Sequence, residues 1–310
     1  MMAKIHTVTG NIDPADLGVT YAHEHLLFQP AEPYRSQDPD LALDDVQAAI
    51  EETRCFAKAG GKCIVEMSTV ELHRDPVGMK AISEASGVHV IAATGFNKSK
   101  FCEDRVVSQT VSQLAEGMVR DLTQGMEGSG IQAGLIKASS SKDLMTAGET
   151  KVFQAAIQAH LRTGAPISTH TEAGTLALEQ VRMLVDGGVH PSHILIGHLD
   201  RKLEWEYLLA VAQSGVYMGF DQISKEKYSP DIERIKWIKR LVEAGFSKQI
   251  VLSADMARRS YWPSYGFGNG PGLTYILWRF VPWMLEEGVP LQAVEAMLVQ
   301  NPAHLFAWAG

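Results

Sequence analysis

The sequence predicts an α/β protein, a single-domain (β/α)8 TIM barrel. Two observations favour this fold: eight short apolar runs alternate with longer segments of helical periodicity, and residues able to bind metal ions stand at the ends of several runs. The chain has 310 residues, which suits a barrel of roughly 250 residues plus insertions. No Pro/Ser-rich linker, low-complexity tract or shift in composition divides residues 1–310.

Eight apolar runs predict the strands. They span residues 19–25, 62–68, 88–96, 131–137, 166–170, 194–199, 216–221 and 249–255. Because these runs are nearly continuous, they are typical of a parallel sheet that is covered on both faces. Eight units favour closure into a barrel over an open sheet, in which a Gly-rich phosphate loop after the first strand would be more usual.

Helices are predicted between the strands, where apolar residues recur at three- and four-residue spacing. The clearest segments span residues 43–58, 106–125, 149–162, 175–187, 203–213 and 231–244. We expect residues 1–18 to form a hairpin or lid across the bottom of the barrel. Residues 272–310 are expected to contain the last helices.

Composition argues against several classes of partner. The formal net charge is -8, and a chain of this sign repels the phosphate backbone of nucleic acid. Only three cysteines occur (Cys55, Cys63 and Cys102), without metal-type spacing, which indicates reduced thiols. The start of the chain has no apolar signal region, and no apolar run is long enough to span a bilayer. We therefore expect a cytoplasmic protein without a nucleic-acid or membrane partner.

Residues of metal-ligand type end four of the predicted strands. His23 and His25 end the first strand and point to one face, because strand side chains alternate in direction. His170 ends the fifth strand, His198 the sixth and Asp255 the eighth. Taken singly, each is more often an ordinary core or surface residue. Together, at the face where barrel enzymes carry their chemistry, they predict a metal site.

Lys137 stands at the end of the fourth predicted strand, in an otherwise apolar run. A buried lysine without a partner carries a large desolvation penalty. One solution is reaction of the neutral amine with CO₂, which gives a carbamate able to bridge two cations. The alternative is that Lys137 extends to the barrel mouth or pairs with Asp255.

The order His-x-His, Lys, His, His, Asp on strands one, four, five, six and eight resembles the amidohydrolase superfamily, specifically its phosphotriesterase-like branch. The segments that carry the resemblance are TYAHEH (20–25), AGLIKASS (133–140), STHTEAGT (168–175), IGHLDR (196–201) and LSAD (252–255). They extend over nearly the whole chain.

The resemblance implies a site for two divalent metal ions. His23, His25 and Asp255 are then expected to hold the more buried ion. His170 and His198 are expected to hold the more exposed one, and Lys137, carboxylated by CO₂ to N6-carboxylysine, to bridge them together with a hydroxide. Zinc is the expected ion for a site rich in histidine, and manganese, cobalt or iron are alternatives.

Other segments are similar to those of phosphotriesterase-like lactonases that open five-membered sugar lactones carrying a phosphate. They are GFNKS (95–99), FDQISKEKYSP (220–230) and DMARRSY (255–261). By this resemblance Lys227, Arg258 and Tyr261 match the contacts to the phosphate end, and Asn97 and Lys98 are expected to line the same pocket. The expected reaction is hydrolysis of a phosphorylated furanose 1,4-lactone by a metal-bridging hydroxide, with Asp255 as proton shuttle.

Several alternatives stay open. The first is a phosphotriesterase or acyl-homoserine lactonase with an apolar pocket, lined by aromatic residues near the last loop: Tyr261, Trp262, Tyr265, Phe267 and Trp278. The others are amide or ester hydrolysis on the same metals, and an inactive barrel that acts as a binding protein. Glu66, Glu172 and Asp200 are candidates for contacts to the ligands or the substrate. The apolar stretch 273–283 could pair two copies of the chain or belong to the core.

Overall fold

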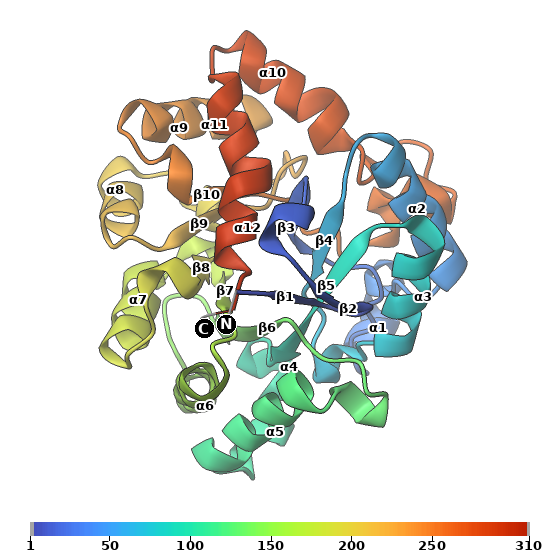
Figure 1. Cartoon of the computed structure of the whole chain (residues 1–310), viewed down its shortest axis with the longest axis vertical. Coiled ribbons are helices and arrows are strands. Elements are labelled where there is room, and N and C mark those ends of the chain that lie inside the picture. The colour runs from blue at the N-terminus through green and yellow to red at the C-terminus, as the bar shows by residue number, and fades with distance from the viewer. Residues whose placement is uncertain (1–2, 309–310) are drawn as a thin grey trace.

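A computed structural model describes residues 3–308, and a barrel of eight parallel strands forms its centre (Figure 1). The strands are β3 (Thr20–Glu24), β4 (Cys63–Glu66), β5 (His89–Gly95), β6 (Leu135–Ser140), β7 (Ile167–Thr171), β8 (Ile194–Ile196), β9 (Tyr217–Phe220) and β10 (Ile250–Leu252). Each pairs with the next along the chain. The first and last strands meet where the backbone N–H of Asp255 donates to the carbonyl of His23 at 3.1 Å. The predicted barrel is confirmed.

Helices surround the strands (Figure 1). They are α1 (Tyr34–Gln37), α2 (Val46–Lys58), α3 (Pro76–Ser86), α4 (Ser99–Val107), α5 (Val111–Thr123), α6 (Ala147–Thr163), α7 (Ala177–Asp186), α8 (Trp205–Gln213), α9 (Asp231–Glu243), α10 (Val281–Glu286), α11 (Leu291–Glu295) and α12 (Asn301–Leu305). The single helix predicted over 106–125 is wrong. Thr110 caps α5 and forms a capping box with Gln113, so the chain ends one helix and begins another there. Helix α3 was not predicted.

Alternation along the strands divides the core into two clusters. Most buried apolar side chains lie between strands and helices. A smaller cluster, which includes Val65, Leu135, Leu195 and Val251, lies inside the barrel. Because side chains on a strand alternate, an inward Leu135 also turns Lys137 inward, two residues closer to the C-terminal end of β6.

The N-terminal end of the barrel is closed. Strands β1 (Ile5–Thr7) and β2 (Gly10–Ile12) form an antiparallel hairpin, and Val8 donates its backbone N–H to Val90 at 2.9 Å, near the start of β5. Figure 1 shows β1 and α12 crossing this end. Functional side chains therefore gather at the opposite, C-terminal end. No helix within residues 3–308 has the length and apolar character to cross a membrane.

Candidate metal centre

The six predicted ligand residues converge at the C-terminal end of the barrel, although the strand ends differ from those predicted. The strand predicted over 131–137 lies further along the chain, which places Lys137 as the third residue of β6. The strands predicted over 194–199 and 249–255 end early. The backbone of His198 (φ 61°) and of Asp255 (φ 48°) is left-handed, so neither residue continues a strand.

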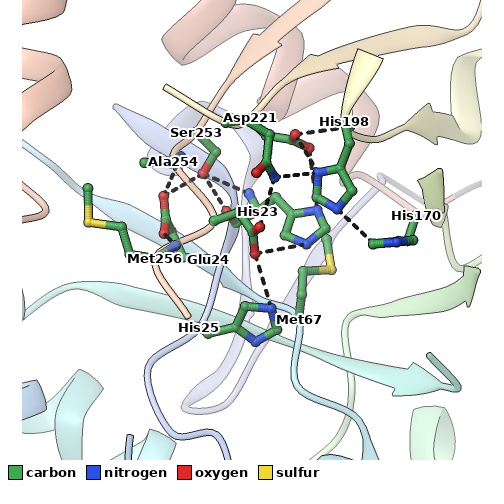
Figure 2. A network of polar contacts seen from close by, with 12 residues as sticks. His23, Glu24, His25, Met67, His170, His198, Asp221, Ser253, Ala254 and Met256 are labelled. Atoms are coloured by element: carbon green, nitrogen blue, oxygen red, sulfur yellow. Dashed lines mark hydrogen bonds and ion pairs between the residues drawn. The ribbon is translucent and has the colours of Figure 1, made fainter. Parts of the chain in front are cut away.

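Glu24 holds Asp255 in its left-handed conformation. A non-glycine residue in this region costs about 1–3 kcal/mol and persists only where its surroundings fix it. The fully buried carboxylate of Glu24 accepts hydrogen bonds from the backbone N–H groups of Ala254 (2.7 Å) and Met256 (2.8 Å), on either side of Asp255. It also accepts the hydroxyl of Ser253 at 2.7 Å. Figure 2 shows these hydrogen bonds of Glu24 on one side of the site.

Four histidine rings lie close together in the site (Figure 2), and two of them contact Asp255. Nε2 of His23 lies 3.9 Å and Nε2 of His25 lies 3.4 Å from Oδ1 of Asp255. Nε2 of His198 lies 2.8 Å from Nδ1 of His170. Each ring therefore turns one nitrogen toward a shared centre.

In three of the four rings the second nitrogen has a hydrogen-bond partner in the surrounding protein. Nδ1 of His25 lies 2.9 Å from the hydroxyl of Ser68, which donates to Glu66 at 2.6 Å. Nε2 of His170 lies 3.2 Å from Glu172. These partners fix the ring orientation and leave the inward nitrogen free to bind a cation.

The ring nitrogens have the electrostatics that a cation needs. Burial lowers the pKa of His25 to about 4 and the pKa of His23 and His170 well below the usual range. These rings are therefore neutral at pH 7, with lone pairs directed inward. Burial opposes ionisation of Asp255, but Lys225 and His25 hold its pKa well below the usual range. Neutral imidazoles around an ionised carboxylate fit divalent cations of the zinc type.

Lys137 lies between these groups and is 1% exposed. Among residues 3–308, the hydrogen bond found for its amine is to the carbonyl of Met67 at 3.1 Å, whereas an ammonium carries three donors. Burial lowers the pKa of Lys137, although Asp255 and Glu66 oppose that shift. The structure therefore fits a neutral amine, the form that reacts with CO₂. The alternative that Lys137 extends to the mouth does not fit this burial.

Asp221, at the end of β9, is a functional residue that the sequence reasoning missed. Its Oδ1 lies 2.7 Å from Nδ1 of His198 and its Oδ2 lies 3.5 Å from Nδ1 of His23. The carboxylate therefore orients His198 and places a negative charge beside His23, a ligand of the other expected ion. The signal was present, because an acidic residue ended the seventh predicted strand at the face that carries the ligands.

We expect Asp221→Asn to weaken metal binding about 10- to 100-fold, as loss of an outer partner of ligand histidines does. An amide can still accept a hydrogen bond from His198, but it offers no negative charge to the two histidines. Metal affinity can be measured by competition with a chelating dye. Unchanged affinity with unchanged ring tautomers in NMR spectra would contradict the role given to Asp221.

A cavity of about 200 Å³ opens beside the four histidines. Asn97 and Lys98, both predicted, line it together with Glu172, Arg201 and Tyr228. Its apolar wall is formed by Phe28, Leu41, Phe101 and Ala257. Glu172 was a candidate for a contact to the ligands or the substrate, whereas Arg201 was not predicted, because its position depends on loops that follow neighbouring strands.

Lys227, Arg258 and Tyr261 were predicted to contact the phosphate end of the substrate. Among residues 3–308, they are not part of the lining of this cavity. The guanidinium of Arg258 pairs with Asp38 at 2.8 Å and Asp40 at 3.2 Å. The ammonium of Lys227 lies 5.8 Å from the ring centre of Tyr261.

The aromatic residues of the apolar-pocket alternative also lie outside the lining. Trp262 is fully buried and donates its indole N–H to the carbonyl of Met256 at 3.0 Å. Phe267 and Trp278 are exposed at 45% and 64% of their surface. Their positions therefore give no support to an aromatic channel.

The chain is similar to known proteins over nearly its whole length. The family model described as "Phosphotriesterase family" matches residues 3–306. The crystal structure of a lactonase from Listeria monocytogenes is similar with a TM-score of 0.94 and 36% identity, covering 99% of this chain and 100% of that one. The phospho-furanose lactonase of Mycoplasmopsis synoviae is 33% identical over 97% of this chain and 91% of its own length. The phosphotriesterase homology protein of Escherichia coli, crystallised with phosphate in its active site, is 34% identical with a TM-score of 0.90, covering 95% of this chain and 100% of that one.

Proposed function

The chain belongs to the phosphotriesterase family, and on this premise we propose that it is a metal-dependent lactonase that opens a phosphorylated furanose 1,4-lactone. One observation carries the proposal. Four histidines on or just after three strands, β3, β7 and β8, each direct one ring nitrogen at a common centre beside Asp255 and the buried amine of Lys137. The lactonase relatives support a lactone as the substrate.

His23, His25 and Asp255 would hold one ion, and His170 and His198 the other, with carboxylated Lys137 between them. The side-chain atoms of the first three lie close enough to share an ion. When bound, two divalent cations activate a water molecule and polarise the lactone carbonyl. Zinc is the ion we propose, because imidazole nitrogen dominates the ligand set.

Asp255 carries the proton. One of its carboxylate oxygens faces His23 and His25, where the attacking water would bind between the ions. The other oxygen accepts hydrogen bonds from Lys225 at 2.7 Å and Gln222 at 2.8 Å. Asp255 takes a proton from water as its oxygen bonds to the carbonyl carbon, and it returns that proton to the ring oxygen as the ring C–O bond breaks.

We propose that Lys227 and Tyr261, which lie outside the cavity lining, contact the phosphate end of the substrate from further out. Lys227 lies 4.9 Å from the ring centre of Tyr228, which lines the cavity. Arg258 could join them only by leaving the two carboxylates that hold it.

The test is a substrate panel on metal-loaded protein. We expect phosphorylated furanose lactones to give the highest kcat/KM, with activity lost on chelation and recovered when zinc or manganese is returned. Ring opening releases a proton, so a pH indicator follows it. Higher kcat/KM on neutral long-chain lactones or phosphotriesters would favour the apolar-pocket alternative. Protein that binds no divalent ion under any loading condition would be the inactive barrel.

A further inference from the structure

On the basis of the function proposed above, we propose that Lys98 and Arg201 form the subsite for the anionic group of the substrate, held in place by Glu172. Each comes from the C-terminal end of a different strand. Lys98 follows β5, Glu172 follows β7, and Arg201 ends a 3-10 helix (Leu199–Arg201) that follows β8. All three line the cavity beside the metal centre.

One carboxylate lies between the two cations. Oε2 of Glu172 pairs with the ammonium of Lys98, and Oε1 lies 3.4 Å from the guanidinium of Arg201. Two positive charges against one negative charge leave this wall of the cavity with a net positive charge. Because Glu172 also contacts His170 at 3.2 Å, the subsite has a fixed position relative to the metal centre.

Both cations keep donors for a ligand. Lys98 has three N–H donors and Arg201 has five, and within residues 3–308 the polar side-chain partner found for each is Glu172. The guanidinium of Arg201 lies over the ring of Tyr228, 3.9 Å from its centre, which fixes the plane of its donors. Both side chains are 19% exposed, so a ligand in the cavity can reach them.

Lys98 is protonated for the most part at pH 7. Burial, together with the neighbouring Lys100 and Arg201, lowers its pKa only to about 8. A dianionic phosphate beside it stabilises the ammonium further. The pair therefore offers two positive charges to a bound phosphate.

Arg258 differs from Lys98 and Arg201 in the net charge around it and in its position relative to the cavity. Asp38 and Asp40 together outweigh its single charge, so that cluster is net negative. It also lies outside the cavity lining. A phosphate at Arg258 would have to displace two carboxylates, whereas a phosphate at Lys98 and Arg201 meets an existing positive surface.

The apolar side chains of the cavity also favour binding of the anionic group at Lys98 and Arg201. Phe28, Leu41 and Phe101 give the cavity an apolar side that cannot solvate an anion. In a cavity of about 200 Å³, a small lactone whose charged end points toward Lys98 and Arg201 keeps that end away from the apolar side chains. The subsite thus selects small lactones that carry an anionic group.

The test compares kinetics of Arg201→Met and Lys98→Met on one furanose lactone with and without its phosphate. Each variant is expected to raise KM for the phosphorylated lactone about 10- to 100-fold, the effect of losing a charged hydrogen bond. KM for the unphosphorylated lactone should change less than about threefold. Arg201→Lys should recover part of the loss. Arg182→Met, an exposed arginine on α7, is the matched control and should leave both substrates unchanged.

Metal content of each variant must be measured, because Glu172 contacts His170. Equal losses on both lactones, or a selective loss in Arg258→Met but not in Arg201→Met, would overturn the subsite. If the wild type turns over neither lactone, the proposed function fails by itself. The subsite is then decided by calorimetric binding of ribose 5-phosphate against ribose: Arg201→Met should weaken only the former, and equal binding to wild type and variant would refute the proposal.

Discussion

Lys137→Met should reduce kcat/KM about 10³-fold or more and lower the bound metal from two ions toward one. The structure buries the amine of Lys137 among the ligand side chains, with a carbonyl as its hydrogen-bond partner. Two cations supply several kcal/mol of transition-state stabilisation, and each 1.36 kcal/mol is a tenfold change in rate. Methionine fills the same space but offers no oxygen to bridge the ions. Metal analysis and lactone hydrolysis on the same sample measure the two effects.

Lys137→Glu is the informative partner of that variant, because it restores an oxygen ligand without CO₂. We expect it to retain more metal than Lys137→Met, and to be insensitive to removal of bicarbonate during metal loading. The wild type should load poorly without bicarbonate. Full metal content and activity in Lys137→Met would show that Lys137 is not a ligand, and the bridged site would have to be abandoned.

The ligand set could be predicted from sequence because its physical signals are local. A charged Lys137 in an apolar strand carries a cost that only a function explains, and strand alternation places His23 and His25 together. The alternating pattern of apolar runs and helical segments was likewise sufficient for the barrel. These signals need no knowledge of which residues meet across the fold.

Other features depend on contacts between distant segments. The orientation of Arg258 is set by Asp38 and Asp40, roughly 220 positions away. The sequence of its own cation-rich loop therefore could not indicate that this arginine is paired with carboxylates. The role of Asp221 required knowing that His23 of β3 and His198, which follows β8, both lie against its carboxylate. The early ends of β8 and β10 arise from left-handed residues that neighbouring side chains hold in place.

Glu172 and Arg201 belong to the same group of long-range features. Both lie within segments that carried the family resemblance, but only Glu172 was a candidate contact, and its pairing with two cations could not be predicted. Only the packing of loops after β5, β7 and β8 brings them to Lys98. Substrate recognition in this barrel is therefore harder to predict than metal binding, because ligands are supplied by strands and specificity by loops.

Arg234→Met should lower the free energy of unfolding by about 3–5 kcal/mol, the cost of removing one partner from a buried ion pair. The side chain of Arg234, on α9, is fully buried. It pairs with Asp200 at 2.7 Å and Asp231 at 2.8 Å, and both carboxylates are also fully buried. Methionine would leave two buried negative charges without their cation. Chemical denaturation measures the loss.

The same variant tests how the fold supports the site. Arg234 donates to the carbonyl of Lys225 at 3.3 Å, and Asp200 accepts the backbone N–H of Gln222 at 3.0 Å. Lys225 and Gln222 in turn hold Asp255, so their loop should loosen when Arg234 is replaced, and kcat should fall while metal is still bound. Lys236→Met on the same helix breaks an exposed pair with Glu233 and should cost less than about 1 kcal/mol. Equal effects of the two substitutions would mean that the buried network neither stabilises the barrel nor positions Asp255.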